Sequence, residues 1–281
     1  MSTIHSHWGD WLPREVAAAD PACLTVWYLG CNGFLVKGTD GTVLMIDPYL
    51  GGGDPPRTVR MIPIPFSPES IASCDAILAT HEHTDHTHGP SQAPILERTG
   101  ATFYAPDASI EVAVDDERWS ETHAVVPEQL VTVEEGERFS VGAIDVTVEQ
   151  AHDPDARHPV SFLVSEGEAV FFHGGDARPS EAFSDIGSRY DIDLGALAFG
   201  STGYLDTGDA EGPRYTEWYA GPNDIASAAS QLELSRLLPT HWDMWRGLTA
   251  DPRSIHDHCR SAAHPQLVEV AQIGERIPVL R

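Results

Sequence analysis

The fold is decided by one stretch of this sequence, Asp75-Ala76-Ile77-Leu78-Ala79-Thr80-His81-Glu82-His83-Thr84-Asp85-His86. Its first half is short and apolar, so it predicts a buried strand that ends at Thr80. Its second half packs three imidazoles and two carboxylates into six residues on the loop that follows the strand. Loops at the carboxyl ends of strands are where α/β enzymes carry their chemistry. The stretch therefore predicts a metal site at the edge of a sheet.

The spacing of these residues has a physical reason. In an extended chain, His81 and His83 project from the same side, so both can reach one cation. Asp85 and His86 follow where the chain turns and are expected to face a second cation. Two divalent ions about 3.5–4 Å apart hold a bridging water and lower its pKa to about 7, which supplies a hydroxide nucleophile. The alternative is an exposed His-rich loop without metal, which would need no carboxylate at a fixed offset.

A two-metal site needs further donors, and three strand ends downstream offer them. His152 follows an expected strand over residues 144–148, Asp176 follows residues 170–172, and His241 follows a short strand. Glycines before Asp176 let the backbone come close to an ion. Each of these residues alone is a weak signal. Together they form a complete set, in which Asp176 bridges both ions while His152 and His241 complete one site each.

The remaining sequence alternates between expected strands and helices. A meander of three strands comes first, a second strand-rich half follows, and helices are interleaved. This pattern predicts two sheets packed face to face and covered by helices on both outer sides. The expected strands cover residues 24–29, 34–36, 42–46, 75–80, 101–104, 130–133, 138–141, 144–148, 160–164, 170–172, 194–199 and 237–238, and the expected helices cover 93–98, 107–114, 224–234 and 252–262.

Composition limits the partners. The chain has 281 residues and a formal net charge of −26, from 17 basic and 43 acidic residues. Such a charge disfavours nucleic acid or an anionic membrane surface as a partner and leaves a small-molecule substrate. No stretch approaches the roughly 18 apolar residues of a membrane span, and the first residues do not resemble a signal peptide, so a cytoplasmic protein is expected. We expect a single domain over residues 1–281, and the length is compatible with a homo-oligomer.

The four cysteines are Cys23, Cys31, Cys74 and Cys259. They are scattered and show no Cys-x-x-Cys spacing, which disfavours a disulfide framework or a thiolate zinc site. We expect them to be small core residues. Cys31 lies in the Gly-rich turn Leu29-Gly30-Cys31-Asn32-Gly33, which leaves open a position nearer to the metal site.

The whole donor set resembles that of the metallo-β-lactamase superfamily. By that resemblance the fold is α/β (α+β), a four-layer αβ/βα sandwich. More narrowly, the chain resembles the L-ascorbate-6-phosphate lactonase family from about Trp8 to the last expected helix. The motifs that carry this narrower resemblance are Trp8–Leu12, Trp27–Gly33, Asp47-Pro48, Ala79–His81, His173–Asp176 and His241–Trp245.

The resemblance implies a metal-dependent hydrolase that acts on a small lactone, with or without a phosphate group. Two divalent ions are expected, Mn²⁺ or Zn²⁺, because both accept mixed imidazole and carboxylate donors. Their hydroxide would attack the carbonyl, while Asp85 and Asp176 orient the nucleophile and assist proton transfer. His158 is an alternative to His152 as donor, and His152 is favoured because it follows its strand end more closely.

Four residues beside these motifs are candidate substrate contacts. His173 could touch substrate or cap a strand end, and Trp242 could wall the pocket or simply pack. Arg178 and Arg246 could clamp an anionic group or remain surface charges. Two other functions compete with the lactonase: a phosphodiesterase on the same dinuclear site, and a non-catalytic metal-binding scaffold. The complete donor set argues against the scaffold.

Overall fold

Two seven-stranded sheets form the centre of the protein. The structure is a computed structural model that describes residues 4–55, 57–120, 122–200, 202–205 and 212–280. The first sheet has the order β16 (Arg276–Pro278), β1 (Thr25–Gly30), β2 (Gly33–Lys37), β3 (Val43–Ile46), β4 (Ala76–Leu78), β5 (Thr102–Ala105) and β6 (Leu130–Thr132). The second has the order β15 (Leu267–Val268), β14 (Arg236–Thr240), β11 (Leu194–Ala198), β10 (Ala169–His173), β9 (Val160–Glu166), β8 (Ile144–Gln150) and β7 (Arg138–Val141).

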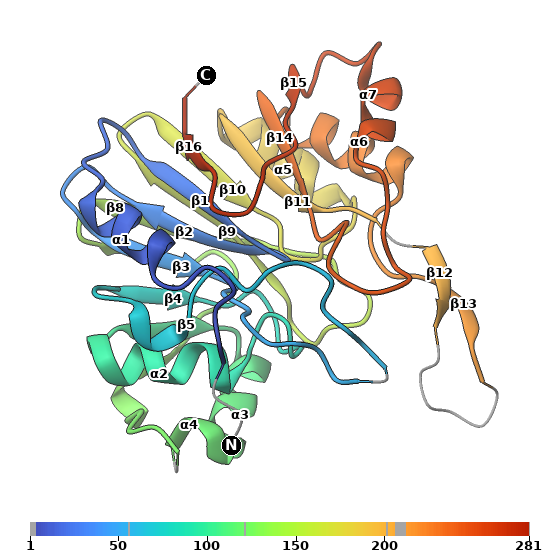
Figure 1. The fold of residues 1–281 in the computed structure, drawn as a ribbon. Helices are drawn as coiled ribbons and strands as arrows, with labels where there is room; N and C mark the ends of the chain where they lie inside the picture. The colour runs from blue at the N-terminus through green and yellow to red at the C-terminus, as the bar shows by residue number, and fades with distance from the viewer. Residues whose placement is uncertain (1–3, 56, 121, 201, 206–211, 281) are drawn as a thin grey trace.

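Helices cover the outer face of each sheet (Figure 1). On the first sheet lie α1 (Trp11–Ala18), α2 (Gly89–Thr99), α3 (Asp107–Asp115) and α4 (Glu117–Ser120), with the 3-10 turns η1 (Pro68–Ser70) and η2 (Pro127–Gln129) nearby. On the second sheet lie α5 (Glu181–Arg189), α6 (Pro222–Gln231) and α7 (Arg253–Cys259). The predicted four-layer sandwich is confirmed.

Strand β1 shows why the sheets carry apolar side chains on both faces. Val26 and Tyr28 pack into the core between the two sheets, whereas Trp27 and Leu29 point the other way, into the core beneath α1 and α2. Side chains alternate along a strand, so a strand covered on both faces must be apolar at every position. All six residues of β1 are buried accordingly.

The parallel parts of the two sheets bring the polar loops together. In the first sheet β3 and β4 run parallel, and in the second sheet β11 runs parallel to both β10 and β14. The motif loop follows β4, Asp176 follows β10, and His241 follows β14. Open α/β sheets bind ligands outside the carboxyl ends of such strands. The loops that carry the candidate ligands therefore meet at one end of the sandwich.

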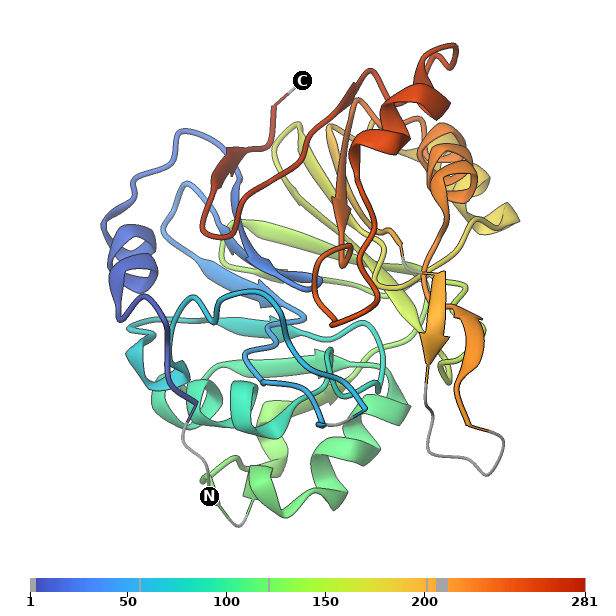
Figure 2. The same ribbon diagram turned by 45° about the vertical axis from the view of Figure 1, so that its right-hand side comes forward.

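Some elements were not expected from the sequence. They include α1, α5, and a two-stranded hairpin formed by β12 (Thr202–Leu205) and β13 (Arg214–Glu217). The hairpin projects away from the sandwich in both views (Figure 2). None of the helices in the described ranges combines the length and the apolar character that crossing a bilayer requires.

Candidate metal centre

The motif loop after β4 folds into a tight turn that gathers its histidines. The amides of His86 and Thr87 both donate to the carbonyl of His83, at 2.9 and 2.8 Å. The Thr87 hydroxyl donates to the carbonyl of His81 at 2.8 Å. As a result Nε2 of His81 lies 2.9 Å from Nδ1 of His83, and the rings of His81 and His86 lie 3.9 Å apart between centroids. Three imidazoles thus face one small volume.

Asp47, at the end of β3, holds this loop from beneath. Its carboxylate is fully buried and accepts hydrogen bonds from the Thr80 amide at 2.8 Å and the Thr80 hydroxyl at 2.7 Å. Nδ1 of His86 lies 2.7 Å from the same carboxylate. A carboxylate on one ring nitrogen fixes the tautomer and orientation of an imidazole and leaves its other nitrogen for a metal. The sequence marked Asp47 only as part of the Asp47-Pro48 motif, and its positioning role was missed.

Asp176 lies between two imidazoles from different segments. Its Oδ2 is 3.3 Å from Nε2 of His86, and its Oδ1 is 3.8 Å from Nε2 of His241. The side-chain amide of Asn32 donates to Oδ1 at 3.1 Å. Gly175 is required for this placement, because its φ is +58° and an added Cβ would lie 2.9 Å from Thr80 Cβ. Each oxygen of Asp176 therefore faces an imidazole from a different segment of the chain.

His241 follows β14 with a left-handed φ of 68°, which turns its ring into the site. Its amide donates to the carbonyl of Cys31 at 2.9 Å, and Tyr219 stacks on its ring at 4.1 Å. Nε2 lies 3.2 Å from Oδ2 of Asp85. Asp85 and His241 thus form a second cluster beside that of His81 and His83. Both residues are in the set expected from the sequence.

The side chain that faces His81 and His83 from the loop after β8 is that of Asp153, whereas that of the neighbouring His152 is exposed. Oδ2 of Asp153 lies 3.7 Å from Nε2 of His81 and 3.9 Å from Nδ1 of His83. The side chain of His152 is exposed, and its carbonyl accepts from the amide of Arg178. His158 is also exposed, with its ring on Asp107 at 3.0 Å. Among the described residues, only Asp153 of these three joins a candidate metal group.

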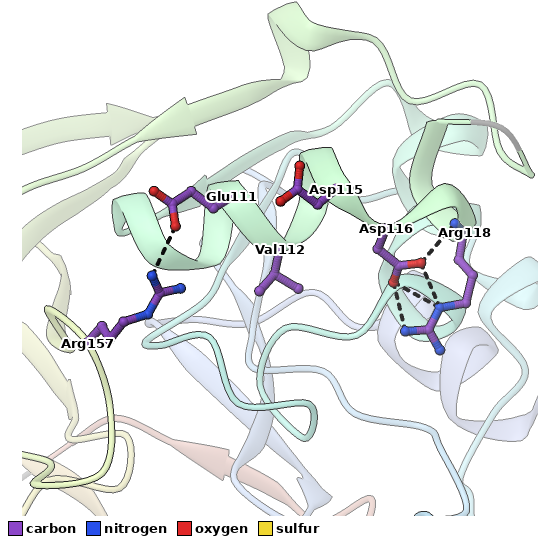
Figure 3. A pocket seen from close by; sticks show the side chains of 6 residues that line it. All are labelled: Glu111, Val112, Asp115, Asp116, Arg118 and Arg157. Carbon is purple, nitrogen blue, oxygen red and sulfur yellow. Dashed lines mark hydrogen bonds and ion pairs between the residues drawn. The ribbon is translucent and has the colours of Figure 1, made fainter.

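The loop that carries Asp153 is tied to its surroundings through Arg157. Its amide donates to Glu82 at 2.9 Å, and its guanidinium pairs with Glu111 on α3 at 3.0 Å (Figure 3). Arg157 and Glu111 border a hollow of about 320 Å³ over α3, which is lined by Glu111, Val112, Asp115, Asp116, Arg118 and Arg157. Arg157 therefore connects the Asp153 loop to the motif loop and to α3.

The four predicted substrate contacts lie in different surroundings. His173 has no exposed surface, and its Nε2 donates to the carbonyl of Asn32 at 2.7 Å, which favours a positioning role. The guanidinium of Arg178 donates to the carbonyl of Glu217 at 3.1 Å. Trp242 is half-buried, and the side chain of Arg246 is exposed.

The chemistry of the donor set fits a divalent cation. Burial lowers the pKa of His81 to about 3, so its imidazole is neutral at physiological pH, the form that binds metal. Nε2 of His86 and Oδ2 of Asp153 are buried and have no hydrogen-bond partner within the described residues. Burial and the nearby Asp176 raise the pKa of Asp153. Buried carboxylates this close together are stabilised by a cation between them.

Comparisons with known proteins identify the family to which this chain belongs. Residues 42–242 match the family model of the beta-lactamase superfamily domain. The chain is 25% identical to the probable L-ascorbate-6-phosphate lactonases UlaG of Salmonella gallinarum and Escherichia fergusonii, over 88% of this chain and 78% of each relative.

Solved structures share the fold at low identity. Igni18, a metallo hydrolase from Ignicoccus hospitalis, matches with a TM-score of 0.65 and 20% identity, over 90% of this chain and 97% of the other. An isothiocyanate hydrolase from Delia radicum gut bacteria matches with a TM-score of 0.64 and 15% identity, over 90% and 98%. The predicted enzyme class, a metal-dependent hydrolase, is confirmed. The chain belongs to the metallo-β-lactamase superfamily, in the branch that resembles the UlaG lactonases.

Proposed function

We propose that this chain is a dinuclear metallohydrolase that opens small lactones. The observation that carries the proposal is the position of Asp176, which belongs to one group of potential ligands with His81 and whose Oδ1 lies 3.8 Å from Nε2 of His241 in the other cluster. A second support is the similarity, over most of the chain, to enzymes named as probable lactonases.

The ligands divide into two groups around Asp176. We assign His81, His83 and Asp153 to one cation, and Asp85, His86 and His241 to the other. Asp153 takes the place that the sequence favoured for His152, because its carboxylate and not the exposed imidazole faces His81. Mn²⁺ and Zn²⁺ are both compatible with these donors.

Divalent ions in this position supply Lewis acidity toward a carbonyl and make a water nucleophilic at neutral pH. Proton transfer is then the task of side chains of this protein. Water adds to the lactone carbonyl, the ring C–O bond breaks, and the proton must reach the departing alkoxide oxygen. Asp85 suits this transfer because its side chain is 18% exposed, against 9% for Asp176, so it is the more accessible of the two carboxylates. Asp176, bonded to Asn32, holds the two halves of the site at a fixed separation.

The test is hydrolysis by metal-reconstituted protein against a panel of lactones, phosphodiesters and amides. We expect lactone turnover that disappears on chelation and returns with Mn²⁺ or Zn²⁺. Turnover of diesters with none of lactones would replace the proposal by the phosphodiesterase alternative. Metal-loaded protein that hydrolyses nothing in the panel would support the scaffold alternative instead.

Adjacent substitutions distinguish the two candidate donors on the loop after β8. Asp153→Ala should lower metal affinity and turnover, whereas His152→Ala, in the same loop, should leave both near the wild-type values. The reverse result would return the ligand role to His152. Asp176→Ala should abolish turnover while the fold is retained, because the residue is needed by both cations.

A further inference from the structure

Cys31 lies inside the second cluster, although nothing in the motif pattern places it there. Its Sγ is 3.4 Å from Nε2 of His241 and 3.9 Å from Oδ2 of Asp85. These are the same two atoms that face each other at 3.2 Å across the cluster. Sulfur, nitrogen and oxygen therefore form a closed triangle of potential ligand atoms.

The backbone around Cys31 is built to hold this position. Gly30 and Cys31 both have left-handed φ values, +83° and +57°, so the turn between β1 and β2 points the thiol toward His241. The carbonyl of Cys31 accepts two hydrogen bonds of 2.9 Å, from the hydroxyl of Tyr28 and from the amide of His241. The same residue is thus tied to the ligand that it faces.

The triangle has the dimensions of a metal coordination sphere. Zinc lies about 2.0–2.1 Å from a nitrogen or carboxylate oxygen and about 2.3 Å from a thiolate sulfur. At angles of roughly 90–110°, such donors lie about 2.9–3.6 Å from one another. Two of the three separations, 3.2 and 3.4 Å, lie in this range, and the third, 3.9 Å, is a few tenths longer.

Cys74 shows what a purely structural thiol looks like in this protein. It is buried on the first sheet, and its sulfur donates to the carbonyl of Ala76 at 3.2 Å. Cys31 is also fully buried, but its sulfur faces an imidazole and a carboxylate. A small core residue needs neither partner. The difference indicates a role in the site rather than in packing.

We propose that Cys31 is a further, thiolate ligand of the second cation, in addition to Asp85, His86 and His241. This inference rests on the dinuclear function proposed above. On binding, the thiol S–H bond breaks, the proton passes to the solvent, and the sulfur donates its electron pair to the ion. Thiolate is a soft ligand that suits Zn²⁺ better than Mn²⁺. The second position should therefore select Zn²⁺ when both metals are offered.

The experiment uses the whole chain, loaded with Zn²⁺ or Co²⁺ and assayed for metal per chain. The X-ray absorption spectrum at the zinc edge should show a sulfur atom at about 2.3 Å from the zinc. The Co²⁺ form should show a thiolate-to-cobalt charge-transfer band in the near ultraviolet. Cys31→Ser should lose the sulfur neighbour and the band, and its affinity for the second cation should fall by roughly tenfold or more. The matched control Cys74→Ser should keep the sulfur neighbour, the charge-transfer band and the affinity for the second cation.

The outcomes separate this inference from the function on which it rests. The ligand role of Cys31 is overturned, and the dinuclear function is not, if the protein holds two cations per chain without a sulfur neighbour. The same follows if the charge-transfer band survives in Cys31→Ser. Protein that binds fewer than two cations contradicts the dinuclear proposal, and the wild-type sulfur signal still decides the role of Cys31. Because that signal is measured on the wild type, the inference stays testable if Cys31→Ser does not fold.

Discussion

Replacement of Asp47 by Asn tests whether a buried residue that touches no cation controls the site. The carboxylate accepts from the Thr80 amide through Oδ1, and from the Thr80 hydroxyl and Nδ1 of His86 through Oδ2. An amide of the same size has only one acceptor oxygen. If its NH₂ group takes the place of Oδ2, His86 must accept at Nδ1 and carry its proton on Nε2. That proton would occupy the nitrogen that faces Asp176.

The magnitude follows from the contacts. Loss of a partner that orients a metal-binding histidine typically costs 10–100-fold in metal affinity, which is about 1.4–2.7 kcal/mol. If the NH₂ group takes the place of Oδ1 instead, the buried Thr80 amide loses its acceptor, which costs about 1–3 kcal/mol of stability. Either orientation of the amide is therefore unfavourable, and we expect at least a tenfold loss of metal affinity.

Metal affinity is measured by competition with a chromophoric chelator, and stability by urea unfolding of the metal-free protein. Asp193→Asn is the matched control, because Asp193 is buried and accepts from the amide of Val170 at 2.9 Å. It precedes β11, at the opposite end of the strand from the site. The control should lose stability and keep its metal affinity. Wild-type metal affinity in Asp47→Asn would refute the positioning role.

Three further substitutions test single contacts. Gly175→Ala should lower the free energy of unfolding in urea by about 2 kcal/mol or more, because strain at positive φ adds to the close contact with Thr80. Gly136→Ala, where φ is positive but the space around the added Cβ is open, should lower it by about 1 kcal/mol. Equal losses in the two variants would argue against crowding at Gly175. Lys37→Met should lower the urea midpoint by the equivalent of about 1–3 kcal/mol, because Nζ donates to three carbonyls at the end of α1, and an unchanged midpoint would contradict this. Hydrogen bonds from Thr42 lower the pKa of Asp40, so its stabilising effect is complete above the unfolded pKa of about 3.9 and disappears as pH falls through the lower folded pKa. Asp40→Asn should therefore be less stable than the wild type at pH 7 and similar to it in strong acid, and a difference in stability independent of pH would exclude this linkage.

The sequence predicted the parts of the fold whose patterns are local. The apolar strands and the two sheets were expected because buried strands read as continuous apolar runs. Helix α5 was missed because Gly187 interrupts its helical pattern. An added Cβ at Gly187 would lie 2.3 Å from the carbonyl of Gln231, so the glycine serves a close contact with the end of α6 that no local pattern contains.

The residues of the candidate site were also predicted in part from local patterns. The order of the donors along the chain identified the motif loop, Asp176 and His241, which the structure brings together. It could not decide between His152 and Asp153, because adjacent residues in a loop point in different directions and only the fixed loop decides which one faces inward. Arg157, which pairs with Glu82 and Glu111, helps to fix that loop through long-range contacts. Cys31 was expected to be a small core residue, with a position nearer to the site left open, because its distance to His241 depends on how the two sheets pack.

The proposed ligands also bear on the charge of the substrate. Asp85, Asp153 and Asp176 with the Cys31 thiolate carry four negative charges, which equal the charge of two divalent ions. A site without net positive charge in a chain of net charge −26 does not attract an anion. Arg178, one of the two candidate clamps for an anion, already donates to the carbonyl of Glu217. Among lactones, we therefore expect the uncharged ones to be opened with higher kcat/KM than their phosphorylated counterparts, and a preference for the phosphorylated forms would show that this charge balance is wrong.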